Sequence, residues 1–270
     1  MKRYKTILCA MALAAVAGWT SGCSNIIHSL QARDQLNKGV NAFKNAAYPQ
    51  AVEHFKRAIQ LDPTFLNARL YLASAYMSQY VPGAESEENK RNAEAATKGF
   101  MEVLERDPNN TLAVESLGSL AFNQKQFDEA KKWYNKLIQL DPNKKEAYYN
   151  IAVIDWTRAF QPDSEVRAKT GMRPEEPGPI KDKKAREELK AKVEEPIKEG
   201  IEMLQKALAI DPNYDDAMGY LSLLYRQQAD IADSVEDSKK ITAQADEWMQ
   251  KTLDIKKKKT ESPSGAPKAG

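Results

Sequence analysis

Four phrases with the same pattern of apolar and polar residues recur along the chain, and each ends in the dipeptide Asp-Pro. Within each phrase an apolar residue is followed by others three and four positions later, a spacing that places all of them on one face of an α-helix. The proline then ends the helix, because it lacks a backbone N–H and clashes with the preceding turn. The pattern predicts four amphipathic helices that stop at Asp-Pro, in the phrases Phe55–Pro63, Phe100–Pro108, Tyr134–Pro142 and Leu204–Pro212.

The Asp-Pro dipeptides are separated by intervals of 45, 34 and 70 residues. The segment 111–144 forms a complete repeat, with Gly118 on its first predicted helix and Ala130 on its second. These small residues allow the two helices to approach closely, while Tyr134 and Leu137 lie one turn apart on the face toward the neighbouring helix. The pattern resembles the tetratricopeptide repeat (TPR) family, whose unit is a helix–turn–helix of 34 residues.

The resemblance covers most of the chain and implies an all-α fold, a right-handed α-solenoid of about five TPR-like helix hairpins. Stacking is needed because each hairpin has too little apolar surface to be stable alone. We expect an export leader at residues 1–22, a tether at 23–31, the solenoid at 32–258 and a disordered tail at 259–270. The expected units of the solenoid are 32–65, 66–110, 111–144, 145–214 and 215–258.

The second and fifth units each contain 11 residues more than the family's 34. Eleven residues make almost three helical turns, so the helices of these units can be longer than usual and keep the same packing face. In the second unit, Val81-Pro82-Gly83 predicts the turn between the helices. In the fifth, nothing between Arg226 and Trp248 is expected to break a helix strongly.

The fourth unit departs furthest from the repeat length, and a charged helical insertion is predicted at about residues 161–195. We expect the first helix to end near Phe160 and a proline-rich irregular segment to continue to Ile180. The second helix is expected to be kinked or restarted at Pro196. A degenerate extra repeat is the alternative, and it is disfavoured because Glu187 and Glu188 would occupy positions that are apolar in the other units.

In the TPR family the first helices of successive units line a concave groove that holds a peptide or a partner helix, and the resemblance implies such a groove here. Its aromatic members suit the anchoring of apolar side chains. For Trp156, packing beneath the insertion is an alternative role. The clamp of two lysines and two asparagines that some TPR co-chaperones use for a C-terminal carboxylate is not matched. The expected groove residues are Asn67, Leu70, Glu115, Phe122, Asn123, Tyr149, Trp156, Arg226 and Gln227.

The first residues have the features of an export leader. Three basic residues precede the apolar run Ile7–Trp19, which as a helix would be about 20 Å long and too short for a bilayer core of about 30 Å. The following Thr20-Ser21-Gly22-Cys23 resembles the bacterial lipobox, and this implies acylation of Cys23 and a lipid anchor. Because Ser24 and not Asp follows, the resemblance favours the outer membrane. Cleavage after Ala17, with a free thiol on Cys23, is the alternative.

Composition and charge exclude several classes of protein. Hydrophobic residues make up 42% of the chain and charged residues 29%, which does not fit a polytopic membrane protein. Without residues 1–22, which hold three bases and no acid, 37 bases face 38 acids, so no electrostatic case exists for binding nucleic acid. Neither His28 nor His54 has a partner at metal-ligand spacing, and no phosphate-binding loop or nucleophile motif occurs. We expect no cofactor and no metal.

The predicted function is therefore binding without catalysis. We expect a lipid-anchored TPR adaptor at the bacterial cell envelope, with a protein or peptide partner and membrane contact through the acylated Cys23. A dedicated accessory subunit of an outer-membrane assembly, secretion or pilus machine is the second hypothesis. A hydrolase acting on envelope polysaccharide or peptidoglycan is a remote third, since it would need paired carboxylates in a cleft. The pair Asp215-Asp216 is better explained as favouring the start of a helix.

Overall fold

The computed structural model describes residues 27–173 and 176–261. The regular structure within these ranges is helical throughout, so the predicted all-α fold of TPR-like hairpins is confirmed. The chain divides into two compact units, Met1–Gln124 and Lys125–Gly270, and this boundary falls inside the predicted third repeat. The predicted leader, the lipidation site at Cys23 and most of the predicted tail lie outside the described residues.

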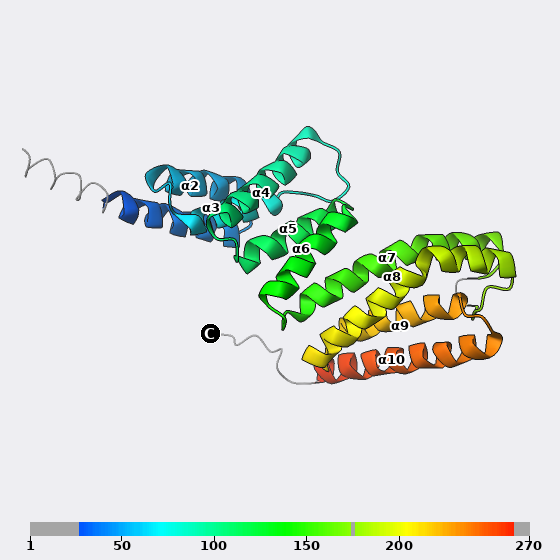
Figure 1. Cartoon of the computed structure of the whole chain (residues 1–270). Helices are drawn as coiled ribbons and strands as arrows, with labels where there is room; N and C mark the ends of the chain where they lie inside the picture. The colour runs from blue at the N-terminus through cyan, green and yellow to red at the C-terminus, as the bar shows by residue number, and fades with distance from the viewer. Residues whose placement is uncertain (1–26, 174–175, 262–270) are drawn as a thin grey trace, which may run out of the picture. The chain divides into compact units, whose positions relative to one another are not determined.

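Unit 1 is a series of helices in which each packs against the next along the chain (Figure 1). Its first hairpin joins the helical residues 27–44 to α2, where Phe55 packs directly on Gly39. Asn89, which is 6% exposed, fixes the turn of the second hairpin, because its carboxamide bonds to both main-chain groups of Val81 and to the carbonyl of Ala84. The turn predicted at Val81-Pro82-Gly83 is therefore confirmed. The labelled helices are α2 (Tyr48–Leu61), α3 (Leu66–Met77), α4 (Glu87–Arg106) and α5 (Thr111–Asn123).

Unit 2 contains two long hairpins, α7 with α8 and α9 with α10, and α6 packs against α7 (Figure 1). Helices α7 and α9 also contact each other, so the two hairpins are stacked. Among the described residues, none of the helices is both long and apolar enough to cross a membrane. The helices are α6 (Phe127–Leu140), α7 (Lys145–Lys169), α8 (Lys183–Ile210), α9 (Asp215–Asp230) and α10 (Val235–Glu261).

The four Asp-Pro dipeptides end four helices in the same way. Helices α2, α4, α6 and α8 each stop one residue before the aspartate, whose φ lies at −136°, −134°, −139° and −131° respectively. The following proline excludes the helical conformation at this residue by steric clash. The carboxylates of Asp62, Asp141 and Asp211 then accept the main-chain N–H two residues later, at 2.9, 3.0 and 2.9 Å. The predicted helix ends are confirmed, and the next helix starts within a few residues.

The fourth repeat is an elongated hairpin. Helix α7 has 25 residues and continues through Pro162 to Lys169, so the expected end near Phe160 is wrong. Helix α8 has 28 residues and continues through Pro196 without a restart. Between the two helices, the described residues 170–173 and 176–182 are irregular, and we call these two stretches the connector. Most of the extra length therefore extends the two helices of one hairpin, and no extra repeat is inserted.

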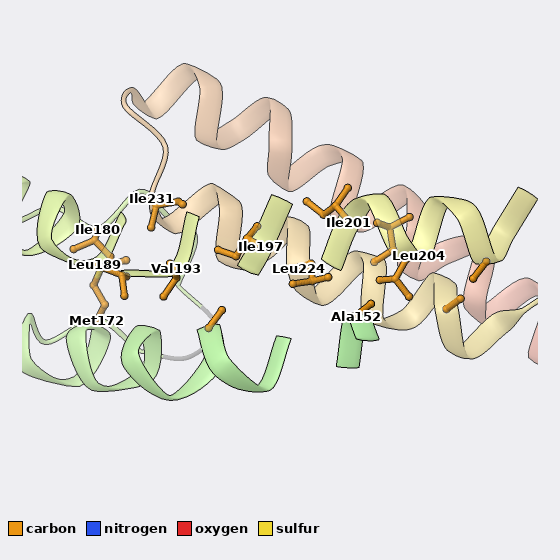
Figure 2. Close-up of a cluster of buried hydrophobic side chains, with 14 residues drawn as sticks. Ala152, Met172, Ile180, Leu189, Val193, Ile197, Ile201, Leu204, Leu224 and Ile231 are labelled. Carbon is orange, nitrogen blue, oxygen red and sulfur yellow. The ribbon is translucent and has the colours of Figure 1, made fainter. Parts of the chain in front are cut away.

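A continuous buried core explains why these helices persist through their prolines. On α8, Leu189, Val193, Ile197 and Leu204 are each at most 1% exposed. They pack in one cluster with Met172 and Ile180 of the connector and with residues of α7 and α9 (Figure 2). A proline inside a helix costs about 3 kcal/mol, whereas each fully buried large apolar side chain contributes roughly 1.5 to 3 kcal/mol. Several such side chains offset the loss at each proline.

The fifth unit forms the expected hairpin, but the position of the break between α9 and α10 was not predicted. Helix α9 ends at Asp230 and α10 begins at Val235. The hydroxyl of Ser234 accepts the main-chain N–H of Asp237 at 3.0 Å and donates to its carboxylate at 2.7 Å. This is an N-cap, which satisfies a main-chain N–H in the first turn of a new helix. The sequence signal is the Ser-x-x-Asp spacing at residues 234–237.

Two helix-interior glycines test the packing of the hairpins. A Cβ atom at Gly99 of α4 would lie 2.8 Å from the Cβ of Ala73 on α3, whereas one at Gly219 of α9 would have its nearest neighbour at 3.9 Å. We expect Gly99→Ala to destabilise the protein by about 1 to 3 kcal/mol through overpacking. Gly219→Ala should stabilise it by up to about 1 kcal/mol through helix propensity. Thermal unfolding followed by circular dichroism measures both, and equal shifts in the same direction would contradict the close contact of α3 and α4.

Candidate functional site

A ladder of aromatic rings runs along the contact between α7 and α9. Tyr149 lies 5.3 Å from Tyr214 and 5.4 Å from Tyr220, measured between ring centroids. Trp156 lies 5.3 Å from Tyr220 in an edge-to-face arrangement and stacks on Phe160 at 4.9 Å. Burial raises the pKa of Tyr149 and Tyr214, so both hydroxyls remain neutral. The ladder joins two predicted groove residues, Tyr149 and Trp156, through a tyrosine that was not predicted.

A cavity of about 370 Å³ lies at the end of this ladder. It is bounded by the C-terminal halves of α7 and α9, by the connector and by Thr242 of α10. Its apolar walls include Trp156, Phe160, Met172 and Leu223. Phe160 is 49% exposed whereas Met172 is 5% exposed, so the walls extend from the surface into the core. We call this cavity the connector pocket.

A buried ion pair holds the connector in place beside α9. The Nη1 of Arg167 donates to both carboxylate oxygens of Asp230, at 2.6 and 2.7 Å. Its Nη2 donates to the main-chain carbonyls of Arg173 and Glu176 in the connector. The guanidinium therefore bonds to α9 and to the connector at the same time, and Arg167 itself is only 8% exposed.

Two main-chain features complete this attachment. The N–H of Ile180 donates to the carbonyl of Asp230 at 2.9 Å. Gly178 lies against the same turn, where a Cβ atom would be 2.7 Å from the carbonyl oxygen of Ala229. A larger residue at position 178 would push the connector away from α9.

Asp163 shares the buried environment of this ion pair. Burial, together with the negative charge of the neighbouring Asp230, raises the pKa of Asp163 to about 8. Burial also raises the pKa of Asp230, although the Arg167 guanidinium opposes that shift. The carboxyl of Asp163 is therefore mostly protonated at neutral pH, because ionisation would place two negative charges beside one positive charge in a buried site.

Gln227 is the most unusual polar residue of the pocket. It is 5% exposed, and neither its amide nitrogen nor its amide oxygen has a hydrogen-bond partner among the described residues. The Oδ1 atom of Asp163 is likewise buried without a hydrogen-bond partner among the described residues. Buried polar groups without partners are rare in folded proteins and cost about 1 to 3 kcal/mol each. Unpaired polar atoms are thus buried in the side chains of two residues that line the connector pocket.

The nine predicted groove residues fall into two sets. Trp156, Arg226 and Gln227 line the connector pocket, and Tyr149 belongs to the aromatic ladder. Trp156 is also partly buried against the hydrophobic core of unit 2, so the two roles predicted for it are compatible. The remaining five lie in unit 1, on α3 and α5, which contact each other, and they are Asn67, Leu70, Glu115, Phe122 and Asn123.

Several residues of this site were not predicted from the sequence. Asp163 and Arg167 were assigned to an irregular segment because Pro162 precedes them. Their spacing of four residues, acid before base, is typical of a helix and could have indicated that α7 continues. Tyr220 and Asp230 carry no local signal, since their importance depends on which helices α9 contacts.

A second, partly buried ionic cluster lies elsewhere in unit 2. The ammonium group of Lys131 on α6 contacts Asp155 on α7 and Glu199 on α8, each at 2.8 Å. Burial raises the pKa of Asp155 to about 6. In the described part of the chain, no group of three or more His, Cys, Asp or Glu side chains could hold a metal ion.

Two sequence families match parts of the chain. Residues 118–156 match the TPR repeat, and residues 35–125 match the plant-specific mitochondrial import receptor subunit TOM20. A segment of 115 residues is 29% identical to Hsp70-Hsp90 organizing protein 3 of Arabidopsis thaliana, and 105 residues are 29% identical to mitochondrial import receptor subunit TOM70 of Rattus norvegicus. The alignments cover 43% and 39% of this chain but only 19% and 17% of those relatives.

Solved structures resemble a larger share of the chain. MamA from Desulfovibrio magneticus RS-1 has a TM-score of 0.57 at 16% identity, with 86% of this chain and 98% of that chain covered. Another crystal structure of MamA has a TM-score of 0.55 at 16% identity and covers 88% of this chain and 98% of its own. Identity at this level shows the fold alone. Together with the matched repeat, these similarities support the interpretation of the chain as a TPR protein.

The raised pKa of Asp163 predicts a dependence of stability on pH. A carboxyl group whose pKa is higher in the folded state binds more protons when folded, so its contribution to stability is lost as the pH rises through that value. We therefore expect the melting temperature to fall by several degrees between pH 5 and pH 8. Asp163→Asn, which keeps the shape without the charge, should flatten this dependence and raise the melting temperature at pH 8.

Asp254→Asn, at an exposed position of α10, serves as the control and should keep the wild-type dependence. If the melting temperature of Asp163→Asn fell between pH 5 and pH 8 as steeply as that of the wild type, the raised pKa assigned to Asp163 would be contradicted. Differential scanning calorimetry over this range measures the effect.

Proposed function

We propose that this TPR protein is a lipid-anchored adaptor at the bacterial cell envelope, which binds a protein partner without chemical transformation. The observation that carries the proposal is the aromatic ladder of α7 and α9, which leads into the connector pocket. These are the first helices of two neighbouring hairpins, the surface on which the TPR resemblance implies a groove. Partly buried aromatic side chains beside a pocket are typical of the residues that contribute most to binding energy.

The comparisons support binding as the general activity. The relatives that share similar segments are named as an Hsp70-Hsp90 organizing protein and as a mitochondrial import receptor subunit. Only about a fifth of each relative is matched. We infer that the feature in common is the capacity of stacked hairpins to hold another polypeptide.

The geometry of the acidic residues argues against a hydrolase. Asp163 and Asp230 are close together in the connector pocket, and two carboxyl groups that share a proton can act as a catalytic dyad. Here, however, both oxygens of Asp230 accept hydrogen bonds from Arg167, and the two aspartates are only 6% and 5% exposed. Glycoside hydrolysis needs carboxyl groups about 5 Å or more apart, with room for substrate between them. We therefore assign this pair a structural role.

Attachment to the envelope rests on the lipobox-like segment before Cys23. Acyl chains on this residue would tether the helical region at the membrane surface. A dedicated accessory subunit of an outer-membrane assembly, secretion or pilus machine is compatible with the same geometry. Purification from detergent-solubilised membranes distinguishes the two: one stoichiometric partner indicates a subunit, and several weakly held partners indicate an adaptor.

Replacement of Trp156 tests the binding surface. Trp156→Ala removes the ring that joins the ladder to the pocket, and we expect capture of the cross-linked partner in cells to fall at least about tenfold, as for a central aromatic contact. Trp133→Ala, on α6 and outside the ladder, is the control and should retain capture. The helical circular dichroism of both variants should equal that of the wild type. Undiminished capture by Trp156→Ala would exclude this surface.

Replacement of Cys23 tests the anchor. Cys23→Ser removes the thiol that would carry the acyl chains, so we expect the protein to move from the membrane fraction to the soluble fraction. Cys9→Ser changes the other cysteine, inside the predicted leader, and should leave the membrane fraction unchanged. Persistent membrane attachment of Cys23→Ser, or release of both variants alike, would contradict lipid anchoring at this position.

A further inference from the structure

The connector pocket has the size of a small-molecule site. Its volume of about 370 Å³ lies within the range of such sites, about 300 to 1,000 Å³. Apolar cavities of about 150 Å³ already admit benzene, so this pocket has room for two fused rings. The part of α7 beyond Phe160 and the connector supply much of its wall. Both belong to the elongated hairpin, which the packing of a unit of 34 residues does not require.

Aromatic rings and a thioether line the pocket. Trp156 and Phe160, which stack on each other at 4.9 Å between ring centroids, both contribute to the wall. Met172 lines the pocket from the connector and also belongs to the buried cluster of Figure 2. Contacts between aromatic rings are favourable beyond the area that they bury, and methionine sulfur also contacts ring edges favourably. These side chains therefore favour an aromatic ligand over a saturated one of the same size.

The charges around the pocket favour a neutral ligand. Three of the charged side chains in its wall form ion pairs of 2.6 to 2.7 Å, which are Arg167 with Asp230, Arg226 with Asp246 and Glu176 with Lys181. A charged ligand would lose its hydration and would have to compete with these existing partners for compensation. A neutral aromatic molecule meets neither cost.

The inner wall of the pocket is fixed by contacts within the protein. Arg167 bonds to Asp230 and to two carbonyls of the connector, and the N–H of Ile180 donates to the carbonyl of Asp230. Met172 and Ala229, which line the pocket, are only 5% and 2% exposed. A site whose wall is already ordered loses little conformational freedom when it binds a ligand.

We propose that the connector pocket binds a small neutral molecule with two fused aromatic rings, which lies against Trp156, Phe160 and Met172. This ligand is additional to the protein partner of the proposed function. The inference concerns the pocket alone, and it does not depend on whether a polypeptide binds along the aromatic ladder.

Titration with 2-naphthol tests the proposal in the full chain. The probe is neutral at pH 7 and consists of two fused aromatic rings with one hydroxyl group. We expect saturable binding with a Kd of about 0.1 to 1 mM. It should appear as a ring-current shift of the Met172 methyl resonance in NMR spectra of protein with isotope-labelled methionine. Met218 of α9 is buried but does not line the pocket, so its methyl resonance is the internal control and should not shift.

A variant that fills the pocket tests the location of the ligand. Ser164 lines the pocket and is exposed on α7, so Ser164→Phe places a ring in this space without disturbing the core. We expect 2-naphthol binding to weaken at least about tenfold, because less of the ligand can be buried. Glu165→Phe adds the same ring at the next exposed position, outside the pocket, and should bind as the wild type does. Equal affinities of the two variants would overturn the inference.

Melting temperatures show whether Ser164→Phe acts through the pocket or through the fold. Both phenylalanine variants should melt as the wild type does. If Ser164→Phe melts lower, Phe160→Ala decides, because it removes a ring that is 49% exposed and leaves the buried wall intact. We expect Phe160→Ala to bind 2-naphthol at least about threefold more weakly through the lost ring contact. Undiminished binding by Phe160→Ala would overturn the inference.

Two further probes test the class of ligand. Decahydro-2-naphthol has the same two-ring skeleton without aromaticity and should bind at least about threefold more weakly. The anion 2-naphthalenesulfonate should bind at least about tenfold more weakly. Equal or tighter binding of either probe would overturn the inference, as would the lack of a saturable shift of Met172 up to the solubility limit of 2-naphthol. If capture of a protein partner in cells persists while 2-naphthol fails to bind, the proposed function stands and this inference fails.

Discussion

The buried ion pair between Arg167 and Asp230 is the contact on which the specific features of unit 2 depend. It joins the extended end of α7 to the last turn of α9, and the same guanidinium holds two carbonyls of the connector. A buried ion pair contributes little net stability, because desolvation offsets attraction, but loss of one partner is costly. Its main effect here is to define position. The placement of the pocket wall formed by the connector and the raised pKa of Asp163, which lies beside Asp230, both follow from that position.

The helix ends along the chain follow one simpler rule, which is repeated at each Asp-Pro dipeptide. Each Asp-Pro forces one residue out of the helical conformation, and in three of the four the aspartate carboxylate accepts a main-chain N–H of the turn that follows. The helices on either side then bury apolar stripes against each other. This rule produces similar hairpins along the chain, whereas the side chains on the first helix differ from one hairpin to the next. Function is therefore expected where a hairpin departs from the rule, as α7 and α8 do.

The sequence predicted what depends on local pattern. The helix ends at Asp-Pro and the turn near Pro82 follow from residues close together in the chain, and they are confirmed. The continuation through Pro162 was mispredicted because the local cost of proline is evident, while the buried core that offsets it depends on distant segments. Across Pro196 a kinked or restarted helix was expected, and α8 continues there without a restart. For the same reason Trp156, Arg226 and Gln227 were predicted as groove residues, but their convergence with Asp163 and Asp230 on one pocket could not be predicted without knowing that α7 contacts α9.

Hydrogen exchange of the connector provides the most direct test of the central claim, which is that the Arg167–Asp230 pair positions the pocket wall. The double variant Arg167→Met, Asp230→Asn removes the pair without leaving a buried unpaired charge. The main-chain N–H of Ile180, which donates to the carbonyl of residue 230, reports on the connector. We predict that its exchange accelerates at least about tenfold, while the amides of α2 to α4 in unit 1 exchange as in the wild type. Unchanged protection of Ile180 would show that the connector is held by apolar packing alone and would contradict the account.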